Sequence, residues 1–329
     1  MSYTFLFLLT FALTLTLTIT AIRILLPILT RRHLGQRILE IGPAWHRSKE
    51  GTPTMGGLSF VISCFISLAV AGALLFSNLP PLFWRPMLLT LLFALGNAAI
   101  GAVDDLSKFR KKQNEGLSPS QKLILQFSVA GAYIALLQLY GYLDTTVYIP
   151  YLDVAWDLGL IYYLPATLLA VGMVNFFNLT DGIDGLAASN GLIYAAFFAV
   201  AATLLDEAPT MLLATAMMAA CLGFLFFNRH PARIFMGDTG SLFLGGMGVG
   251  CGFLIANPLL ILVVGGVFLL EGISVILQVG FYKMTGRRLF LMAPLHHHLE
   301  KRGMCEEKIV LFFALLGLAF GLIAIPGLF

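Results

Sequence analysis

Residues 3–29 read "YTFLFLLTFALTLTLTITAIRILLPIL", an apolar run long enough for a helix to cross the roughly 30 Å hydrocarbon layer of a membrane. Threonines are dotted along this run, and it has neither a basic leading segment nor a small-residue cleavage site. It therefore predicts a retained helix rather than a signal peptide. The chain contains ten such runs: 3–29, 58–76, 87–103, 123–143, 160–177, 186–205, 211–227, 242–256, 259–281 and 309–325.

The composition agrees with a membrane protein, because 59% of the residues are hydrophobic and only 11% are charged, against about 25% charged in an ordinary soluble domain. The four cysteines, Cys64, Cys221, Cys251 and Cys305, are far apart and predict neither a disulfide framework nor a zinc site. The apolar runs leave no segment over for a soluble domain. We therefore expect one all-α transmembrane catalytic domain, residues 1–329, with ten membrane-spanning helices.

The basic residues predict the orientation of these helices. Ten crossings would place both termini on one side, and every Lys and Arg except Arg23 and Arg85 lies in the segments that follow odd-numbered runs. The positive-inside rule makes these five segments cytoplasmic and both termini periplasmic or extracellular. All six histidines also fall in the cytoplasmic segments. On the outer side, residues 142–159 carry β-branched and aromatic residues around Pro150, which predicts a small β-hairpin.

The first cytoplasmic segment, "HRSKEGTPTMGG" (46–57), places His46, Arg47 and Lys49 beside a turn rich in glycine and proline. Cations beside such a turn suit a phosphate, because backbone N–H groups can approach an anion closely. A positive-inside loop that leads into a helix explains the same residues. From this segment alone, that simpler interpretation is favoured.

The second cytoplasmic segment, "GAVDDLSKFRKK" (101–112), places Asp104 and Asp105 at the end of an apolar run. Adjacent carboxylates at a membrane boundary are costly unless they bind a cation or take part in proton chemistry. Neighbours on a helix point about 100° apart, so one could face a metal or lipid phosphate while the other holds a lysine. A solvated helix end is the alternative, but acids are disfavoured near a helix C-terminus, and this favours a functional pair.

The third and fourth cytoplasmic segments are "NFFNLTDGIDGLAASNG" (175–191) and "NRHPARIFMGDTGS" (228–241). Polar side chains at membrane depth are tolerated where they line a wet cavity. Asp238 alone could be the N-cap of the following helix. With Asp104, Asp105, Asp181 and Asp184 on the same side, an oxygen-lined site for Mg²⁺ or Mn²⁺ explains it better.

Five motifs, taken together, resemble the phospho-N-acetylmuramoyl-pentapeptide transferase family, within the superfamily of polyprenyl-phosphate N-acetylhexosamine-1-phosphate transferases. The match follows chain order through all five cytoplasmic segments and covers nearly the whole chain. The aspartate motifs are common to the superfamily, whereas the histidine motif is specific to the muramoyl-pentapeptide branch. The motifs are "GTPTMGG" (51–57), "DDLSK" (104–108), "NLTDGIDGLA" (178–187), "FMGDTGSL" (235–242) and "MAPLHHHLE" (292–300).

The resemblance implies a Mg²⁺-dependent transferase of peptidoglycan synthesis in the bacterial cytoplasmic membrane, with its active site on the cytoplasmic face. It would transfer phospho-N-acetylmuramoyl-pentapeptide from UDP-MurNAc-pentapeptide to undecaprenyl phosphate, giving lipid I and UMP. We expect the bilayer as a partner and no nucleic acid. Small-residue faces such as "GGMGVGCG" (245–252) would allow close helix packing, including a homodimer.

The resemblance also implies roles for single residues. Asp238 is the expected magnesium ligand, Asp104 and Asp105 are the expected catalytic carboxylate pair, and Phe235 is expected to stack on uracil. We expect His297 to contact a donor phosphate and count it with the catalytic residues; a metal chelate or an exposed loop is the alternative for the three histidines. The expected substrate-binding residues are Lys49, Thr54, Lys108, Lys122, Asn175, Asn178, Asp181, Gly182, Asp184, Asn228, Phe235, Gln278, His296 and His298.

Two alternatives to this function and one to its mechanism stay open at this point. A GlcNAc-1-phosphate transferase would use the same lipid, although "MAPLHHHLE" favours the muramoyl branch. A secondary transporter also has about ten helices, but its acids lie near the midplane rather than at one face. Within the transferase, direct attack by the lipid phosphate is preferred over a covalent aspartyl intermediate.

Overall fold

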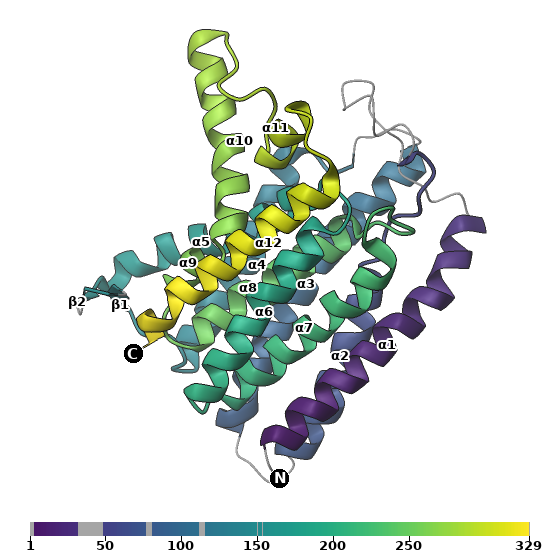
Figure 1. The fold of residues 1–329 in the computed structure, drawn as a ribbon. Coiled ribbons are helices and arrows are strands. Elements are labelled where there is room, and N and C mark those ends of the chain that lie inside the picture. Colours follow the sequence, from purple (N-terminus) through teal and green to yellow (C-terminus); the bar gives the residue numbers. More distant parts are fainter. Residues whose placement is uncertain are drawn as a thin grey trace.

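The protein is described from a computed structural model that covers residues 3–31, 49–76, 81–111, 116–149, 151–152 and 154–328. Most of these residues are helical (Figure 1). Two short strands and two 3-10 helices are β1 (Thr146–Ile149), β2 (Val154–Asp157), η2 (Gly159–Tyr162) and η3 (Ile325–Leu328). The α-helices are α1 (Tyr3–Arg31), α2 (Leu58–Phe76), α3 (Pro81–Lys111), α4 (Pro119–Leu139), α5 (Tyr163–Thr180), α6 (Leu186–Leu204), α7 (Ala208–Asn228), α8 (Gly237–Leu254), α9 (Leu260–Val264), α10 (Gly266–Thr285), α11 (Leu295–Lys301) and α12 (Glu306–Ala324).

Within the described residues, eight helices are long and apolar enough to cross a membrane. Each of the ten predicted apolar runs coincides with helical structure. The prediction of a helical, polytopic membrane protein is therefore confirmed. The predicted β-hairpin is confirmed as well, since β1 and β2 pair antiparallel with Thr146 opposite Asp157.

The ninth apolar run is not the single helix that the sequence predicted. It breaks at Gly265, which separates α9 from α10, because paired glycines favour the helix weakly and allow close packing here. A Cβ atom on Gly266 would lie 2.5 Å from the Phe320 ring of α12. Beyond the break, α10 continues to Thr285, four residues past the predicted end at Phe281, and projects beyond the rest of the bundle (Figure 1).

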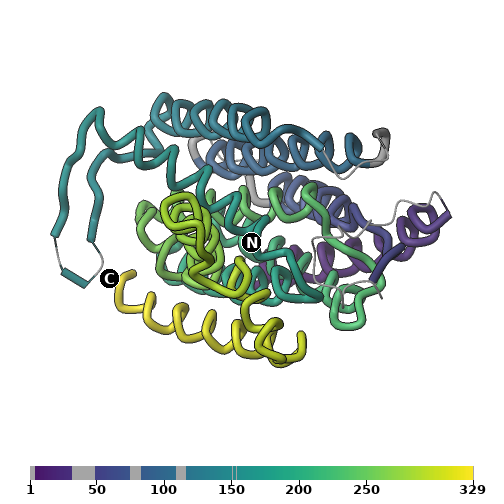
Figure 2. Tube along the Cα trace, turned by 90° about the horizontal axis from the view of Figure 1, so that it is seen from above, coloured from purple at the N-terminus to yellow at the C-terminus, as the bar shows by residue number. Residues whose placement is uncertain are grey.

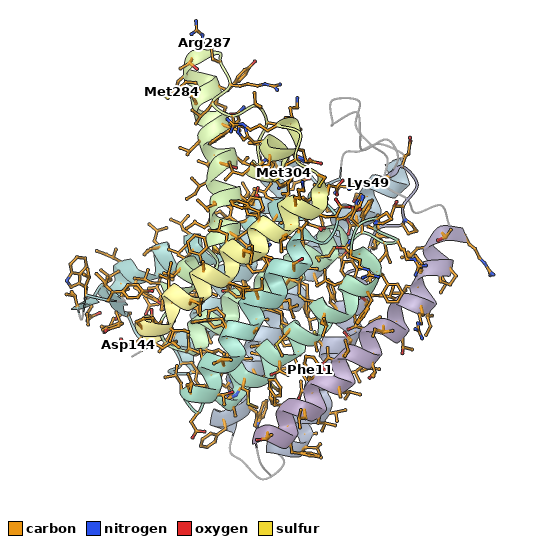
Figure 3. The ribbon with its side chains drawn as sticks, viewed as in Figure 1. Phe11, Lys49, Asp144, Met284, Arg287 and Met304 are labelled. Atoms are coloured by element: carbon orange, nitrogen blue, oxygen red, sulfur yellow. The ribbon has the colours of Figure 1, made fainter. Side chains whose placement is uncertain are left out.

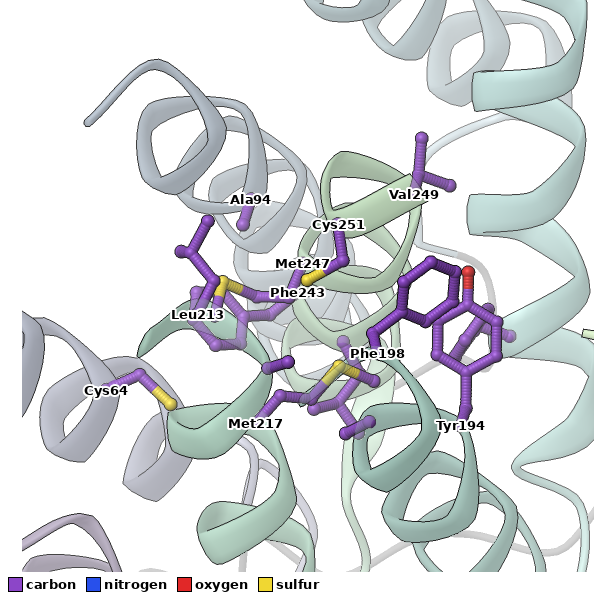
Figure 4. Packing of buried hydrophobic residues seen from close by; sticks show 14 of the residues in the cluster. Cys64, Ala94, Tyr194, Phe198, Leu213, Met217, Phe243, Met247, Val249 and Cys251 are labelled. Atoms are coloured by element: carbon purple, nitrogen blue, oxygen red, sulfur yellow. The ribbon is translucent and has the colours of Figure 1, made fainter. Parts of the chain in front are cut away.

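Helix α8 lies at the centre of the bundle, and every residue from Thr239 to Phe253 is buried. Its glycines allow backbones to touch, since a Cβ atom on Gly246 would lie only 2.7 Å from the Cα atom of Ala94 on α3. Figure 4 shows Met247 of α8 in the same buried cluster as Leu213 of α7. The glycine-rich stretch 245–252 thus packs inside this chain and is not a surface for a second copy.

Two of the threonines along α1, Thr14 and Thr18, face α2. The Thr14 hydroxyl donates to the Ser67 hydroxyl at 2.6 Å, and the Thr18 hydroxyl donates to the Ser63 hydroxyl at 2.7 Å. Interhelical hydrogen bonds of this kind hold apolar helices together where lipid offers no polar partner.

The two ends of the bundle differ. Lys49 and Met304 lie near the end from which α10 projects, which we call the site end, whereas Asp144 lies by the hairpin (Figure 3). Both marked chain ends lie away from the site end (Figure 1). Viewed from above, the hairpin and α1 lie on opposite sides of the molecule (Figure 2). The Tyr151 hydroxyl donates to the Ile323 carbonyl at 2.7 Å and ties the hairpin region to the end of α12.

Candidate functional site

The first and fourth of the five motifs, "GTPTMGG" and "FMGDTGSL", meet at the start of α8. The Gly56 N–H donates to the Phe235 carbonyl at 2.9 Å, and the Phe235 N–H donates to the Pro53 carbonyl at 2.8 Å. A Cβ atom on Gly57 would lie 2.1 Å from the Cα atom of Gly240. Both motifs therefore need glycine at these positions so that the segment before α2 can lie against the N-terminus of α8.

Three carboxylates from two helices form what we call the acidic cluster. Asp104 and Asp105 belong to α3 and are both only 4% exposed, and Asp238 belongs to the first turn of α8. One oxygen of each lies within 4.8 Å of the others. The approach requires Gly101, because a Cβ atom there would lie 2.3 Å from the Asp238 carbonyl oxygen. The structure thus brings together three of the five acids that the sequence selected for a cation site; Asp181 and Asp184 do not belong to this cluster.

Asp105 caps the N-terminus of α8 from a different helix. Its carboxylate accepts the Asp238 N–H at 3.2 Å, the Thr239 N–H at 3.0 Å and the Thr239 hydroxyl at 2.7 Å. The position before the helix is Met236, which makes no side-chain cap. The interpretation of Asp238 as an N-cap is therefore wrong, and its carboxylate points elsewhere.

Asp104 holds the lysine one turn further along α3. Its Oδ2 pairs with Lys108 Nζ at 2.6 Å, and its Oδ1 accepts the Leu117 N–H at 2.7 Å. The two adjacent acids thus have different partners, as expected for side chains that point about 100° apart.

Asp238 is surrounded by cations and an amide. Its Oδ2 pairs with Lys122 at 3.0 Å and Lys108 at 3.3 Å, while its Oδ1 accepts the Asn178 amide at 2.9 Å. Burial disfavours the charge on Asp238, but Lys122, a hydrogen bond with Asp104, Lys108 and Asn178 together hold its pKa below its usual range. Asp238 is therefore ionised at neutral pH, as a ligand for a cation must be.

A second polar group, which we call the Lys49 cluster, consists of Lys49, Asp184, His230 and Glu306. Lys49 Nζ lies between Asp184 Oδ1 at 2.7 Å and Glu306 Oε2 at 2.6 Å. The other Asp184 oxygen pairs with His230 Nδ1 at 3.0 Å. The cluster lines a cavity of about 590 Å³ to which Glu300 also contributes; the residues that line it do not include the acidic cluster. Lys49 and Asp184 were predicted from the sequence, whereas His230 and Glu306 were not.

Asp181 lies on the loop between α5 and α6, which also carries Asp184. Burial, together with the charges of Asp238, Asp105 and Asp184, raises the pKa of Asp181 to about 7. Within the described residues its carboxylate makes no hydrogen bond. A group in this state lowers the stability of the folded protein once it is ionised.

Replacing Asp181 with Asn should therefore stabilise the protein at alkaline pH. Below about pH 4 the carboxyl group is protonated in both states, but between pH 4 and about 7 only the unfolded state releases its proton, so stability falls as pH rises through this window. We expect the unfolding midpoint of Asp181→Asn, measured in detergent with EDTA, to exceed that of the wild type by about 3 °C or more at pH 8. The difference between the two unfolding midpoints should narrow towards pH 4.

The exposed Asp206→Asn is the control for this measurement, and it should show no such pH-dependent gap. Equal unfolding midpoints of Asp181→Asn and the wild type at pH 8 would show that ionised Asp181 does not destabilise the folded protein.

The three histidines lie on the short helix α11, not in the exposed loop that was one alternative interpretation, and each has a different partner. His296 Nδ1 lies 3.0 Å from Glu271 Oε2, and His297 Nδ1 lies 2.6 Å from Glu300 Oε2. His298 Nδ1 accepts the Leu291 N–H at 3.1 Å. Among the described residues none of the three belongs to a group that could hold a metal ion, so the chelate interpretation loses support.

Several predicted substrate-binding side chains are held by contacts within the protein. Asn175 donates to Gln126 Oε1 at 2.9 Å, and Asn228 accepts the Gly185 N–H at 3.0 Å. Gln278 accepts the Phe290 N–H at 2.8 Å and braces the loop after α10. Within the described residues its hydrogen bonds go to this loop and not to the acidic cluster.

Three other predicted residues do lie close to the clusters or the histidines. Thr54 is near the start of α8, because a Cβ atom on Gly237 would lie 3.0 Å from its hydroxyl. Phe235 is half-buried and lies beside the segment that carries Thr54. Gly182 lies against His296. Their substrate contacts stay predictions.

Comparison with known proteins gives consistent results. The family model described as glycosyl transferase family 4 matches residues 87–256. The chain is 43% identical over 301 residues to a phospho-N-acetylmuramoyl-pentapeptide-transferase of Shouchella clausii, covering 91% of this chain and 90% of the relative. It is 41% identical over 306 residues to the protein of that name from Bacillus subtilis, covering 93% and 92%. The corresponding protein of Staphylococcus aureus is 39% identical over 304 residues, covering 92% and 93%.

Proposed function

The chain belongs to the phospho-N-acetylmuramoyl-pentapeptide-transferase family, and from this premise we propose that it transfers phospho-MurNAc-pentapeptide from UDP-MurNAc-pentapeptide to undecaprenyl phosphate. The products are lipid I and UMP, in peptidoglycan synthesis. The observation that carries the proposal is the identity of about 40% over some nine-tenths of both chains, together with an acidic cluster flanked by lysines at one end of a membrane bundle.

The acidic cluster fits a Mg²⁺ ion. Its donors are carboxylate oxygens from Asp104, Asp105 and Asp238, without sulfur or imidazole, and hard oxygen donors are those that Mg²⁺ prefers. Asp238 is the principal ligand in this proposal, because its carboxylate is held ionised and lies beside the two lysines that would bind the phosphates. When bound, Mg²⁺ would neutralise phosphate charge and favour departure of UMP.

Lysines around the acidic cluster supply the second part of the phosphate site. Lys108 and Lys122 lie on α3 and α4, and their ammonium groups converge on one Asp238 oxygen. Two anionic reactants repel each other, and these cations offset that repulsion and hold the phosphates for in-line transfer. Asn178 bridges Lys122 and Asp238 and keeps both oriented.

The location of the site suits one soluble and one membrane-anchored substrate. The acidic cluster lies near the end of α3, a candidate membrane span, so a lipid phosphate can reach it from the bilayer while the donor enters from water. The concentration of Lys and Arg in these segments supports a cytoplasmic site, with ten crossings and both termini outside.

Direct attack by the lipid phosphate is supported by the state of the acid pair. Both Asp104 oxygens and both Asp105 oxygens are already hydrogen-bonded or ion-paired within the protein, which is a poor state for a carboxylate nucleophile. A phosphate with a second pKa near 6 is itself mostly ionised at pH 7. Asp104 then orients the acceptor, together with Lys108.

The test of the proposed function follows UMP release by purified protein in detergent with undecaprenyl phosphate. We expect release with UDP-MurNAc-pentapeptide that stops with EDTA and returns with Mg²⁺, and little release with UDP-GlcNAc. If the protein preferred UDP-GlcNAc, UDP-GlcNAc would be its donor in place of UDP-MurNAc-pentapeptide. Absence of UMP release by folded protein with any divalent ion, with substrate flux into proteoliposomes instead, would favour a transporter.

A further inference from the structure

A glutamate inside a candidate membrane span is paired with the first histidine of the histidine motif. Glu271 of α10 and His296 of α11 are both wholly buried. The Glu271 carboxylate lies 3.0 Å from His296 Nδ1 and accepts the backbone N–H of the same residue at 3.2 Å. One side chain thus fixes both the ring and the backbone of His296.

Apolar residues flank this pair on α10 and α11. Val267, one turn before Glu271 on α10, belongs to a buried hydrophobic cluster with Ile183, Ile309 and Phe313. An unbalanced charge in such a place costs several kcal/mol, so a net-neutral pair is strongly favoured.

Of the three proton arrangements that make the pair neutral, the one with a protonated Glu271 and the ring hydrogen on Nδ1 leaves the carboxyl hydrogen without an acceptor among the described residues. Two arrangements remain. In the first, Glu271 is ionised and His296 is an imidazolium, which carries a hydrogen on both ring nitrogens. In the second, the protonated Glu271 donates to Nδ1, and the ring hydrogen is on Nε2. His296 Nε2 therefore carries a hydrogen in both arrangements.

That N–H has no acceptor within the described part of the chain. His296 Nε2 is fully buried without a hydrogen-bond partner there. It lies against Gly182, where a Cβ atom would come within 2.2 Å of it. Buried donors are seldom left unpaired, and one that faces the loop carrying Asp181 and Asp184 points to a ligand oxygen at that loop.

We propose that Glu271 is a positioning residue that keeps a hydrogen on His296 Nε2, and that this N–H donates to an oxygen of the donor substrate beside Gly182. The inference rests on the proposed function and deepens it. The oxygen belongs either to the UMP half or to the sugar-phosphate half of the donor, and both present acceptors of the same kind.

The test compares Glu271→Met, which removes the acceptor, with Glu271→Gln, whose amide can accept the backbone N–H and donate to Nδ1. We expect Glu271→Met to raise the KM for UDP-MurNAc-pentapeptide about tenfold or more, the effect of one lost hydrogen bond. The KM for undecaprenyl phosphate should change less than about twofold. Glu271→Gln should restore most of the donor affinity, because it preserves the hydrogen on Nε2.

Ser274→Ala is the matched control on α10. Ser274 is buried and donates to the Glu271 backbone carbonyl at 2.6 Å without any contact to His296. It should leave both KM values unchanged even if it lowers the unfolding midpoint. Inhibition by UMP then separates the two sources of the oxygen: weaker inhibition of Glu271→Met places the contact on the UMP half, and unchanged inhibition with a raised donor KM places it on the sugar-phosphate half.

A second measurement needs no folded Glu271 variant. In the wild-type protein labelled with ¹⁵N-histidine, the Nε2 resonance of His296 should have the chemical shift of a protonated ring nitrogen. This resonance is assigned by its loss in His296→Gln. An unprotonated Nε2 would overturn the inference, as would a donor KM of Glu271→Met equal to that of the wild type. Failure of the wild type to release UMP would refute the proposed function instead, and the resonance would still report on the Glu271–His296 pair.

Discussion

Replacing Asp238 with Asn should reduce Mg²⁺-dependent UMP release by at least about 10³-fold, the scale on which single groups that stabilise transferred charge act. The reason is geometric. Asp238 is the member of the acidic cluster whose oxygens meet Lys108, Lys122 and Asn178, so it lies where cation, phosphate and lysines would converge. The amide cannot supply the negative charge that a divalent ion needs. Initial rates at saturating donor and acceptor over a Mg²⁺ titration give the measurement.

The matched control is Asp206→Asn, the same chemical change at an exposed position in the α6–α7 connection. It should retain wild-type rates. The unfolding midpoint of each variant shows that the protein is folded. If folded Asp238→Asn kept more than a tenth of the wild-type rate with the same Mg²⁺ dependence, Asp238 would not be the principal ligand.

The second large effect is expected at Asp104. Asp104→Asn should lower kcat by about 10²–10³-fold, because the neutral amide loses the ion pair that fixes Lys108 beside the acceptor phosphate. Its KM for the donor should change little, since Asp104 acts on the acceptor side in this proposal. Steady-state kinetics of Asp104→Asn with each substrate varied in turn would separate these effects.

A rapid-quench experiment distinguishes the two mechanisms. Wild-type enzyme mixed with donor and Mg²⁺ in the absence of undecaprenyl phosphate should show no burst of UMP whose amount matches the amount of enzyme. A stoichiometric burst of UMP that disappears in Asp104→Asn would instead establish a covalent aspartyl intermediate. Asp206→Asn again serves as the control and should behave as the wild type does in both experiments.

The helices could be predicted from the sequence because hydrocarbon thickness sets a length that apolar runs must reach. The prediction was wrong where tertiary contacts decide. Gly265 and Gly266 interrupt the ninth run because α10 must pass close to Phe320 of α12, a contact that no local pattern reveals. Likewise α11 was not predicted, since seven residues are too few for a clear helical period.

The acidic cluster could be predicted because carboxylates are rare at membrane boundaries and therefore stand out. Their partners could not, since Asp105 and Thr239 are 134 positions apart and meet only through the packing of α3 on α8. Glu306 was missed because an acid at the start of a helix is ordinary. Glu271 offered a usable signal, as a lone acid within an apolar run, and the same argument that selected Asp104 applies to it.

The glycine contacts of α8 have a consequence for how the site works. At Gly246 the backbone of α8 lies against α3 with no room for a methyl group. At Gly101 the backbone of α3 lies similarly close to the Asp238 carbonyl of α8. The helices that carry the three acids therefore cannot slide or turn past each other without leaving van der Waals contact. The acids are preorganised by folding, so that charge developing on a phosphate meets groups already in place and little reorganisation energy enters the barrier.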